Sequence, residues 1–136
     1  MHKDKQPRSG NQGKVFWAQA QKIDRKDKKK RRRMVVMKDN GEHVQVSQLK
    51  SVKEDTRPGK LAKIKSTYPG LTEETGVAER MYNKRADTHE KLKLSDREVF
   101  DSEPVFELDD EDYHRVKSHV KRRGNKKEGP GKKPRT

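Results

Sequence analysis

Residues 34–49, MVVMKDNGEHVQVSQL, give the clearest structural signal in the chain. The run Met34–Met37 is short, apolar and flanked by charged residues, which is typical of a buried strand. Asp39–Gly41 comes soon after it, and asparagine and glycine tolerate the positive φ angles of tight hairpin turns. The run 43–49 then alternates apolar and polar residues with the period of a strand. This stretch therefore predicts a β-hairpin.

Further runs on both sides of the hairpin also resemble strands. Before it, residues 14–21 (KVFWAQAQ) place the rings of Phe16 and Trp17 on opposite faces of a strand. After it, residues 61–64 fit either a strand or one helical turn, and we interpret them as a strand. The run 76–82 does not decide its own structure, but a strand there would continue a barrel. Together these runs predict a mainly β domain.

An acidic segment leads into a predicted C-terminal helix. Residues 101–112 contain seven acids and no base. Asp109 can cap the helix, the acids after it favour the positive end of the helix dipole, and later bases favour the negative end. The apolar stripe is narrow and consists of Tyr113, Val116 and Val120. We therefore expect a helix at 109–122 that lies on a surface, which makes the fold class α+β.

The composition limits the chain to one small domain. Its 136 residues include 36 Lys and Arg against 22 Asp and Glu, a net charge of +14. Val, Ile, Leu and Phe make up about 16% of the chain, below the roughly 20% under which disorder is the usual expectation. We therefore expect a barrel domain at 13–122 between disordered basic tails at 1–12 and 123–136.

Several absences bear on the setting and the chemistry. The chain has no cysteine, which removes disulfides and thiolate catalysis, and small secreted domains often contain disulfides. No run approaches the roughly 18 apolar residues of a membrane span, and the N-terminus lacks the apolar part of a secretory signal. The histidines form no ligand pattern, and no phosphate-binding glycine motif occurs. We therefore expect a cytoplasmic protein that does not insert into membranes and has no metal or cofactor.

The densest charge feature is residues 24–33, DRKDKKKRRR, with eight bases and two acids. Neutralising phosphates with Lys and Arg releases counterions, so this run favours nucleic-acid binding, with a solubilising loop as the alternative. Trp17, Phe16 and Tyr68 can stack on unpaired bases, but we expect Trp17 and Phe16 to pack in the core instead, because the chain has only seven aromatic residues. The predicted nucleic-acid surface consists of Arg25, Lys26, Lys28, Lys29, Lys30, Arg31, Arg32, Lys50 and Trp17.

The order of these elements resembles the PemK/MazF family of toxin ribonucleases. That family opens with a glycine and a tryptophan-bearing strand, continues through a long loop to an Arg-Pro-Val-Val-type strand, and ends the next strand in a Thr-Ser-like pair. The matching pieces here are residues 13–18, 31–37 and 49–51. The resemblance covers residues 13–51, with a looser match over 68–122.

This resemblance implies a small SH3-like barrel, usually a homodimer, that cuts single-stranded RNA without a metal ion. In that chemistry the ribose 2′-OH attacks the adjacent phosphate, and a guanidinium and a hydroxyl can assist. Arg33 matches the family's arginine and Ser51 its hydroxyl, with Ser47 as a second candidate hydroxyl. Met34 and Lys50 stand where the family has proline and threonine.

We therefore expect a growth-inhibiting toxin of a toxin–antitoxin pair, whose antitoxin would mask the cationic groove. The alternative, which Met34 and Lys50 favour, is a non-catalytic RNA- or nucleoprotein-binding protein of a phage or plasmid on the same barrel. A third interpretation is a largely disordered basic chain with one transient helix. On the plainest interpretation Arg33 is one more member of the basic run, and Ser47 and Ser51 face water.

Overall fold

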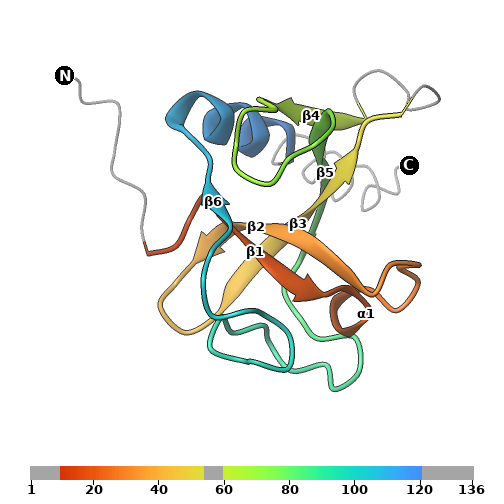
Figure 1. Cartoon of the computed structure of the whole chain (residues 1–136). Helices are drawn as coiled ribbons and strands as arrows, with labels where there is room; N and C mark the ends of the chain where they lie inside the picture. Colours follow the sequence, from red (N-terminus) through yellow and green to blue (C-terminus); the bar gives the residue numbers. More distant parts are fainter. Residues whose placement is uncertain (1–9, 54–59, 121–136) are drawn as a thin grey trace, which may run out of the picture.

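A computed structural model describes residues 10–53 and 60–120. Within these ranges the chain forms six strands, a short helix and a C-terminal helix (Figure 1). The strands are β1 (Lys14–Gln19), β2 (Arg31–Asp39), β3 (Val44–Ser51), β4 (Leu61–Ile64), β5 (Thr75–Tyr82) and β6 (Phe106–Glu107). Helix α1 (Ala20–Ile23) follows β1, and the C-terminal helix occupies residues 110–120. The mainly β prediction and the C-terminal helix are confirmed.

The strands form one antiparallel sheet in the order β4-β5-β3-β2-β1-β6. Figure 1 shows that the sheet curls strongly, like part of a barrel. The predicted hairpin is formed by β2 and β3, in which Val36 pairs with Val46. Gly41 lies in its turn with a φ of 98°, a left-handed conformation that suits glycine. The strand interpretation of residues 61–64 is confirmed as well.

Both faces of the sheet are buried, each in its own core. Val15, Val35 and Leu49 point into the first core, together with the apolar stripe of the C-terminal helix. Phe16 and Met34 are the immediate neighbours of Val15 and Val35 in their strands, and they point into the second core. The second core is covered by the irregular segment 83–105, which in Figure 1 lies on the side of the sheet opposite the C-terminal helix.

The C-terminal helix is capped as the sequence predicts. The Asp109 carboxylate accepts a 2.8 Å hydrogen bond from the backbone N–H of Asp112. The side chain of Asp112 in turn accepts hydrogen bonds from the Lys65 backbone N–H at 3.0 Å and from the Tyr68 hydroxyl at 2.7 Å. These bonds attach the helix to the segment that follows β4, and its apolar stripe is fully buried. The predicted helix end at 122 and the C-terminal tail lie outside the described residues.

Three boundaries differ from the prediction. The first strand ends at Gln19 instead of 21, because Ala20 and Ile23 bury their side chains as part of helix α1. The basic run 24–33 is not a single loop, since its last three arginines belong to β2. Residues 10–12, assigned to the N-terminal tail, form a turn in which Asn11 donates two hydrogen bonds to the Asp39 carboxylate.

The covering segment 83–105 is held by a buried arginine. Arg85 is 6% exposed, and its guanidinium bonds Asp87 at 2.7 and 2.9 Å. The same guanidinium reaches Asp96 and Glu98, each at 2.9 Å. One arginine therefore ties together three points of a segment that has little regular structure.

Among the described residues, neither helix has the length and apolar character of a membrane span.

Gly76 tests how closely β4 packs on β5. A Cβ atom at this position would lie 2.7 Å from the Leu61 Cβ and 3.2 Å from the Ala62 carbonyl oxygen. We expect Gly76→Ala to lower the free energy of unfolding by about 1–3 kcal/mol, because these atoms must move apart. Urea unfolding followed by circular dichroism measures this, with the exposed Ser66→Ala as control. An unchanged midpoint would mean that this edge of the sheet is loosely packed.

Candidate nucleic-acid interface

Trp17 and two arginines lie together on the first face of the sheet, near the end of β1 and the start of β2. Trp17 pairs with Arg33 across the two strands, and Gln19 pairs with Arg31. Since side chains alternate along a strand, Trp17, Arg31 and Arg33 share one face. The Arg31 and Arg33 guanidinium carbons lie 5.3 and 5.1 Å from the centre of the Trp17 ring, within cation–π range. Phe16 is buried, as the core-packing interpretation predicts, whereas Trp17 is partly exposed.

The Arg33 guanidinium is held at the edge of the first core. It donates a 3.3 Å hydrogen bond to the Gly70 carbonyl, so the turn at residues 68–70 lies against it. Partial burial lowers the pKa of Arg33, while the negative charge of nearby Glu73 acts in the opposite direction. The bond to Gly70 is the one hydrogen bond that the described residues give this side chain. Because a guanidinium has five N–H donors, most of them remain available to an anionic ligand.

A hydroxyl and a carboxylate meet beside this arginine. Ser51 is the last residue of β3 and pairs with Thr75 of β5, which brings residue 73 close to it. The Ser51 hydroxyl donates a short hydrogen bond to the Glu73 carboxylate. Ser51 is partly exposed and Glu73 is exposed. The site therefore combines a cation, a hydroxyl and a carboxylate. We call the five side chains Trp17, Arg31, Arg33, Ser51 and Glu73 the arginine–tryptophan site.

Sequence reasoning did not find Glu73. It lies in the run Thr72–Gly76, where two adjacent glutamates have no feature that separates them. Only the pairing of β3 with β5 brings Glu73, but not Glu74, to Ser51; Glu74 instead forms a 3.1 Å ion pair with Lys63. The sequence did not point to Asp101 either. Its carboxylate forms a 2.6 Å ion pair with Arg31, although the two residues are 70 positions apart in the sequence.

Arg32 is committed to the protein itself. Its side chain points to the opposite face from Arg31 and Arg33, and forms a bidentate pair with Asp27 at 2.7 and 2.8 Å. It also donates to the Leu49 carbonyl at 3.3 Å. The Asp27 side chain is 3% exposed, so this pair lies inside the protein. Arg32, predicted as an RNA contact, is instead a structural residue in this arrangement.

The other predicted cations lie outside the arginine–tryptophan site. Lys50 precedes Ser51 and therefore points to the Arg32 side of the sheet. Burial is the main cause that lowers the pKa of Lys50, and the charge of Arg32 adds to it. The predicted cations of the loop before β2 are all exposed, and they are Arg25, Lys26, Lys28, Lys29 and Lys30.

Ser47 is in the wrong place for a catalytic hydroxyl. It is 0% exposed, and its hydroxyl donates a 3.0 Å hydrogen bond to the Arg80 carbonyl. The expectation that it faces either water or RNA is therefore wrong. The reason is that both faces of the central strands are covered, so a polar position in β3 does not have to face solvent.

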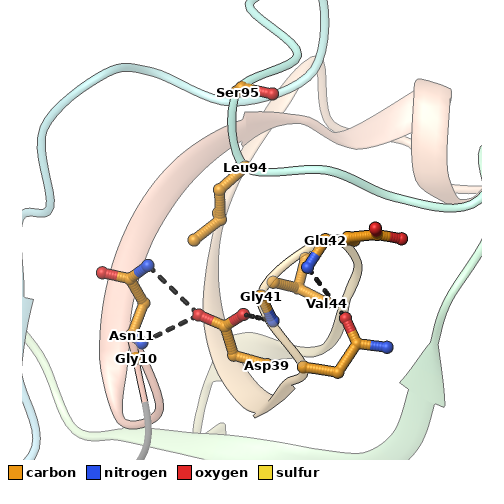
Figure 2. A pocket seen from close by; sticks show the side chains of 9 residues that line it. Gly10, Asn11, Asp39, Gly41, Glu42, Val44, Leu94 and Ser95 are labelled. Atoms are coloured by element: carbon orange, nitrogen blue, oxygen red, sulfur yellow. Dashed lines mark hydrogen bonds between the residues drawn. The ribbon is translucent and has the colours of Figure 1, made fainter.

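A separate pocket of about 630 Å³ lies at the other end of β2. Figure 2 shows it between the turn at Gly10 and Asn11, the hairpin turn at Asp39–Glu42, and Leu94. Of the described residues that line it, two are acids and none is Lys or Arg. This pocket therefore does not suit RNA phosphates.

No group of three acids or histidines with metal-site geometry occurs in residues 10–53 and 60–120.

Comparison with known proteins does not supply an assignment. No family model matches the chain, and no curated protein matches it.

Proposed function

We propose that this protein is a metal-independent endoribonuclease that cleaves single-stranded RNA, in the role of a toxin of the PemK/MazF type on an SH3-like barrel. The observation that supports this proposal most is the meeting of Arg33, Ser51 and Glu73 beside Trp17 on one face of the sheet. Arg33, Ser51 and Trp17 are residues that the sequence singles out independently of this geometry.

The proposed reaction needs a proton acceptor and a cation. The Glu73 carboxylate takes the proton of the ribose 2′-OH, whose oxygen then bonds to the adjacent phosphorus. The Arg33 guanidinium stabilises the negative charge that develops on the phosphate oxygens. The bond from phosphorus to the 5′-oxygen breaks, and that oxygen takes a proton from water. The hydroxide that remains takes the proton from Glu73, which restores the carboxylate. Ser51 orients the Glu73 carboxylate through their hydrogen bond. The products carry a 2′,3′-cyclic phosphate and a 5′-OH.

Binding of the RNA strand would use the surrounding aromatic and basic groups. Trp17 is partly exposed, and an unpaired base can stack on such a ring. The exposed cations of residues 25–30 add electrostatic affinity that does not depend on base sequence. The proposal also includes a homodimer of this chain and a partner antitoxin that covers these cations.

Glu73→Gln tests the proposed proton acceptor. We expect it to slow RNA cleavage by about 10²-fold, because the amide cannot take the 2′-OH proton. The assay is cleavage of a mixed single-stranded RNA pool in EDTA, with mass spectrometry of the new ends for the cyclic phosphate. Glu74→Gln is the matched control, since Glu74 pairs with Lys63 and not with Ser51, and should cleave like the wild type. Intact RNA after incubation with the wild-type protein would contradict the proposed activity.

A second candidate function is RNA binding without cleavage on the same barrel. The observation that favours it is that the site's groups have internal partners: Arg31 pairs with Asp101, and Arg33 bonds the Gly70 carbonyl. Salt-sensitive RNA binding by the wild type with no cyclic phosphate at any end would select this function.

A further inference from the structure

The basic run 24–33 is organised around one buried acid. The Asp27 carboxylate accepts four hydrogen bonds: two from Arg32, one from the Gln48 side chain at 3.0 Å, and one from the Lys29 backbone N–H at 3.0 Å. These partners come from β2, from β3 and from the loop itself. A buried carboxylate is costly unless it is paired in this way. Asp27 is therefore the point at which the loop is attached to the sheet.

The rest of the loop folds around this point. The Gln21 side chain donates to the Asp27 carbonyl at 2.9 Å, and the Asp27 N–H donates to the Asp24 carbonyl at 3.0 Å. The Ala20 N–H donates to the Lys30 carbonyl at 2.9 Å, which closes the loop at its base. The buried acid thus gives a defined conformation to a segment whose lysines would otherwise repel one another.

We infer that Asp27 is a positioning residue for RNA, because its contacts hold the exposed bases of residues 25–30 as a fixed phosphate-binding surface, attached to the sheet on the face that Arg32 and Gln48 share. This inference rests on the proposed function, and it adds a subsite for the RNA backbone apart from the arginine–tryptophan site. A cation array that is already ordered loses less conformational entropy when it binds a strand than a free loop does.

The direction in which Asp27→Asn changes RNA affinity distinguishes a positioning role from an effect of net charge. Asp27→Asn removes a negative charge from a basic surface, so electrostatics alone predict tighter RNA binding. If Asp27 positions the loop, the same variant binds RNA more weakly, because Arg32 loses its bidentate partner and the loop is released. The pKa of Asp27 is lowered, chiefly by its hydrogen bond from Arg32, so the carboxylate is charged at neutral pH.

The experiment measures binding of a mixed-sequence 2′-O-methyl RNA, which cannot be cleaved, over a range of salt concentrations. We expect Asp27→Asn to raise Kd about tenfold. The slope of log K against log salt concentration should become shallower by about 0.7 for each phosphate that the variant no longer neutralises. Where the wild type cleaves RNA, KM should rise with kcat nearly unchanged. The charge-matched control is Glu42→Gln, an exposed acid at the far end of β2, which should bind no more weakly than the wild type.

Tryptic cleavage within residues 25–30 reports the loop itself and needs no RNA. We expect faster cleavage there in Asp27→Asn, at a temperature where circular dichroism shows the variant folded. If that variant does not fold, Gln48→Leu removes one bond to Asp27 without a charge change and should shift both readouts in the same direction. Equal or tighter RNA binding by these folded variants overturns the inference. Absence of RNA binding by the wild type overturns the proposed function instead.

Discussion

Replacing Arg33 with alanine is expected to slow RNA cleavage by about 10³-fold, the cost of losing the principal donor to the developing charge. The half-buried guanidinium has one hydrogen bond to the described protein, at the Gly70 carbonyl, and lies near the Ser51–Glu73 pair. Under the proposed function, its other N–H donors bind the oxygens of the reacting phosphate. The measurement is the single-turnover cleavage rate of an RNA oligonucleotide in EDTA, in which kcat and kcat/KM should fall together.

Two further variants separate this role from net charge. Arg33→Lys keeps the positive charge but loses the planar fork of donors, so it should recover only part of the rate. Arg115→Ala removes the same charge from the C-terminal helix, where the side chain is 48% exposed and bonds Asp112, and should cleave almost like the wild type. An Arg33→Ala protein that cleaves at the wild-type rate would remove Arg33 from the mechanism and leave its packing on Trp17 as its role.

Local sequence signals were sufficient for the elements whose structure depends on near neighbours. The hairpin follows from Asp39–Gly41 between two apolar runs, and the C-terminal helix follows from the Asp109 cap. The segment 83–105 could not be predicted in the same way, because its apolar residues have no regular spacing. Its conformation depends on Arg85, whose charged partners are spread along the segment.

The candidate site was predictable where its residues lie on the hairpin and the strand before it. Trp17, Arg33 and Ser51 meet because β1, β2 and β3 are neighbours in the sheet. The acids that complete the arrangement come from elsewhere: Glu73 reaches Ser51 over 22 residues, and Asp101 reaches Arg31 over 70 residues. Neither interaction leaves a pattern in the sequence.

The basic run also shows the limit of counting charge. By composition, the eight bases of residues 24–33 are equivalent, and its two acids only reduce the total. In the fold Asp27 takes Arg32 into the interior, β2 turns Arg31 and Arg33 toward Trp17, and the lysines stay in solvent. Three roles for one run follow from strand alternation and one buried carboxylate.

Phe100→Ala is expected to lower the free energy of unfolding by about 3–5 kcal/mol, the usual cost of emptying a buried phenylalanine site. Phe100 is 1% exposed and its ring packs edge-on against Phe16, with 6.5 Å between ring centres. It is one of the few large apolar side chains with which segment 83–105 covers the second face of the sheet. Denaturant unfolding followed by fluorescence of Trp17 measures the loss.

The same substitution tests which interaction holds segment 83–105 on the sheet. The two candidates are burial of apolar side chains and the hydrogen bonds and ion pairs of the segment. Around Phe100, the Gln19 N–H donates to the Val99 carbonyl at 2.7 Å and the Asp101 N–H donates to the Trp17 carbonyl at 3.0 Å. If those backbone bonds and the Arg85 pairs dominate, Phe100→Ala should cost no more than a surface change, within about 0.5 kcal/mol. If burial dominates, Phe100→Leu, which leaves a smaller void, should fall between the wild type and Phe100→Ala. We expect the second result, because net hydrogen-bond contributions are about 1 kcal/mol each and the ring fills a closed core.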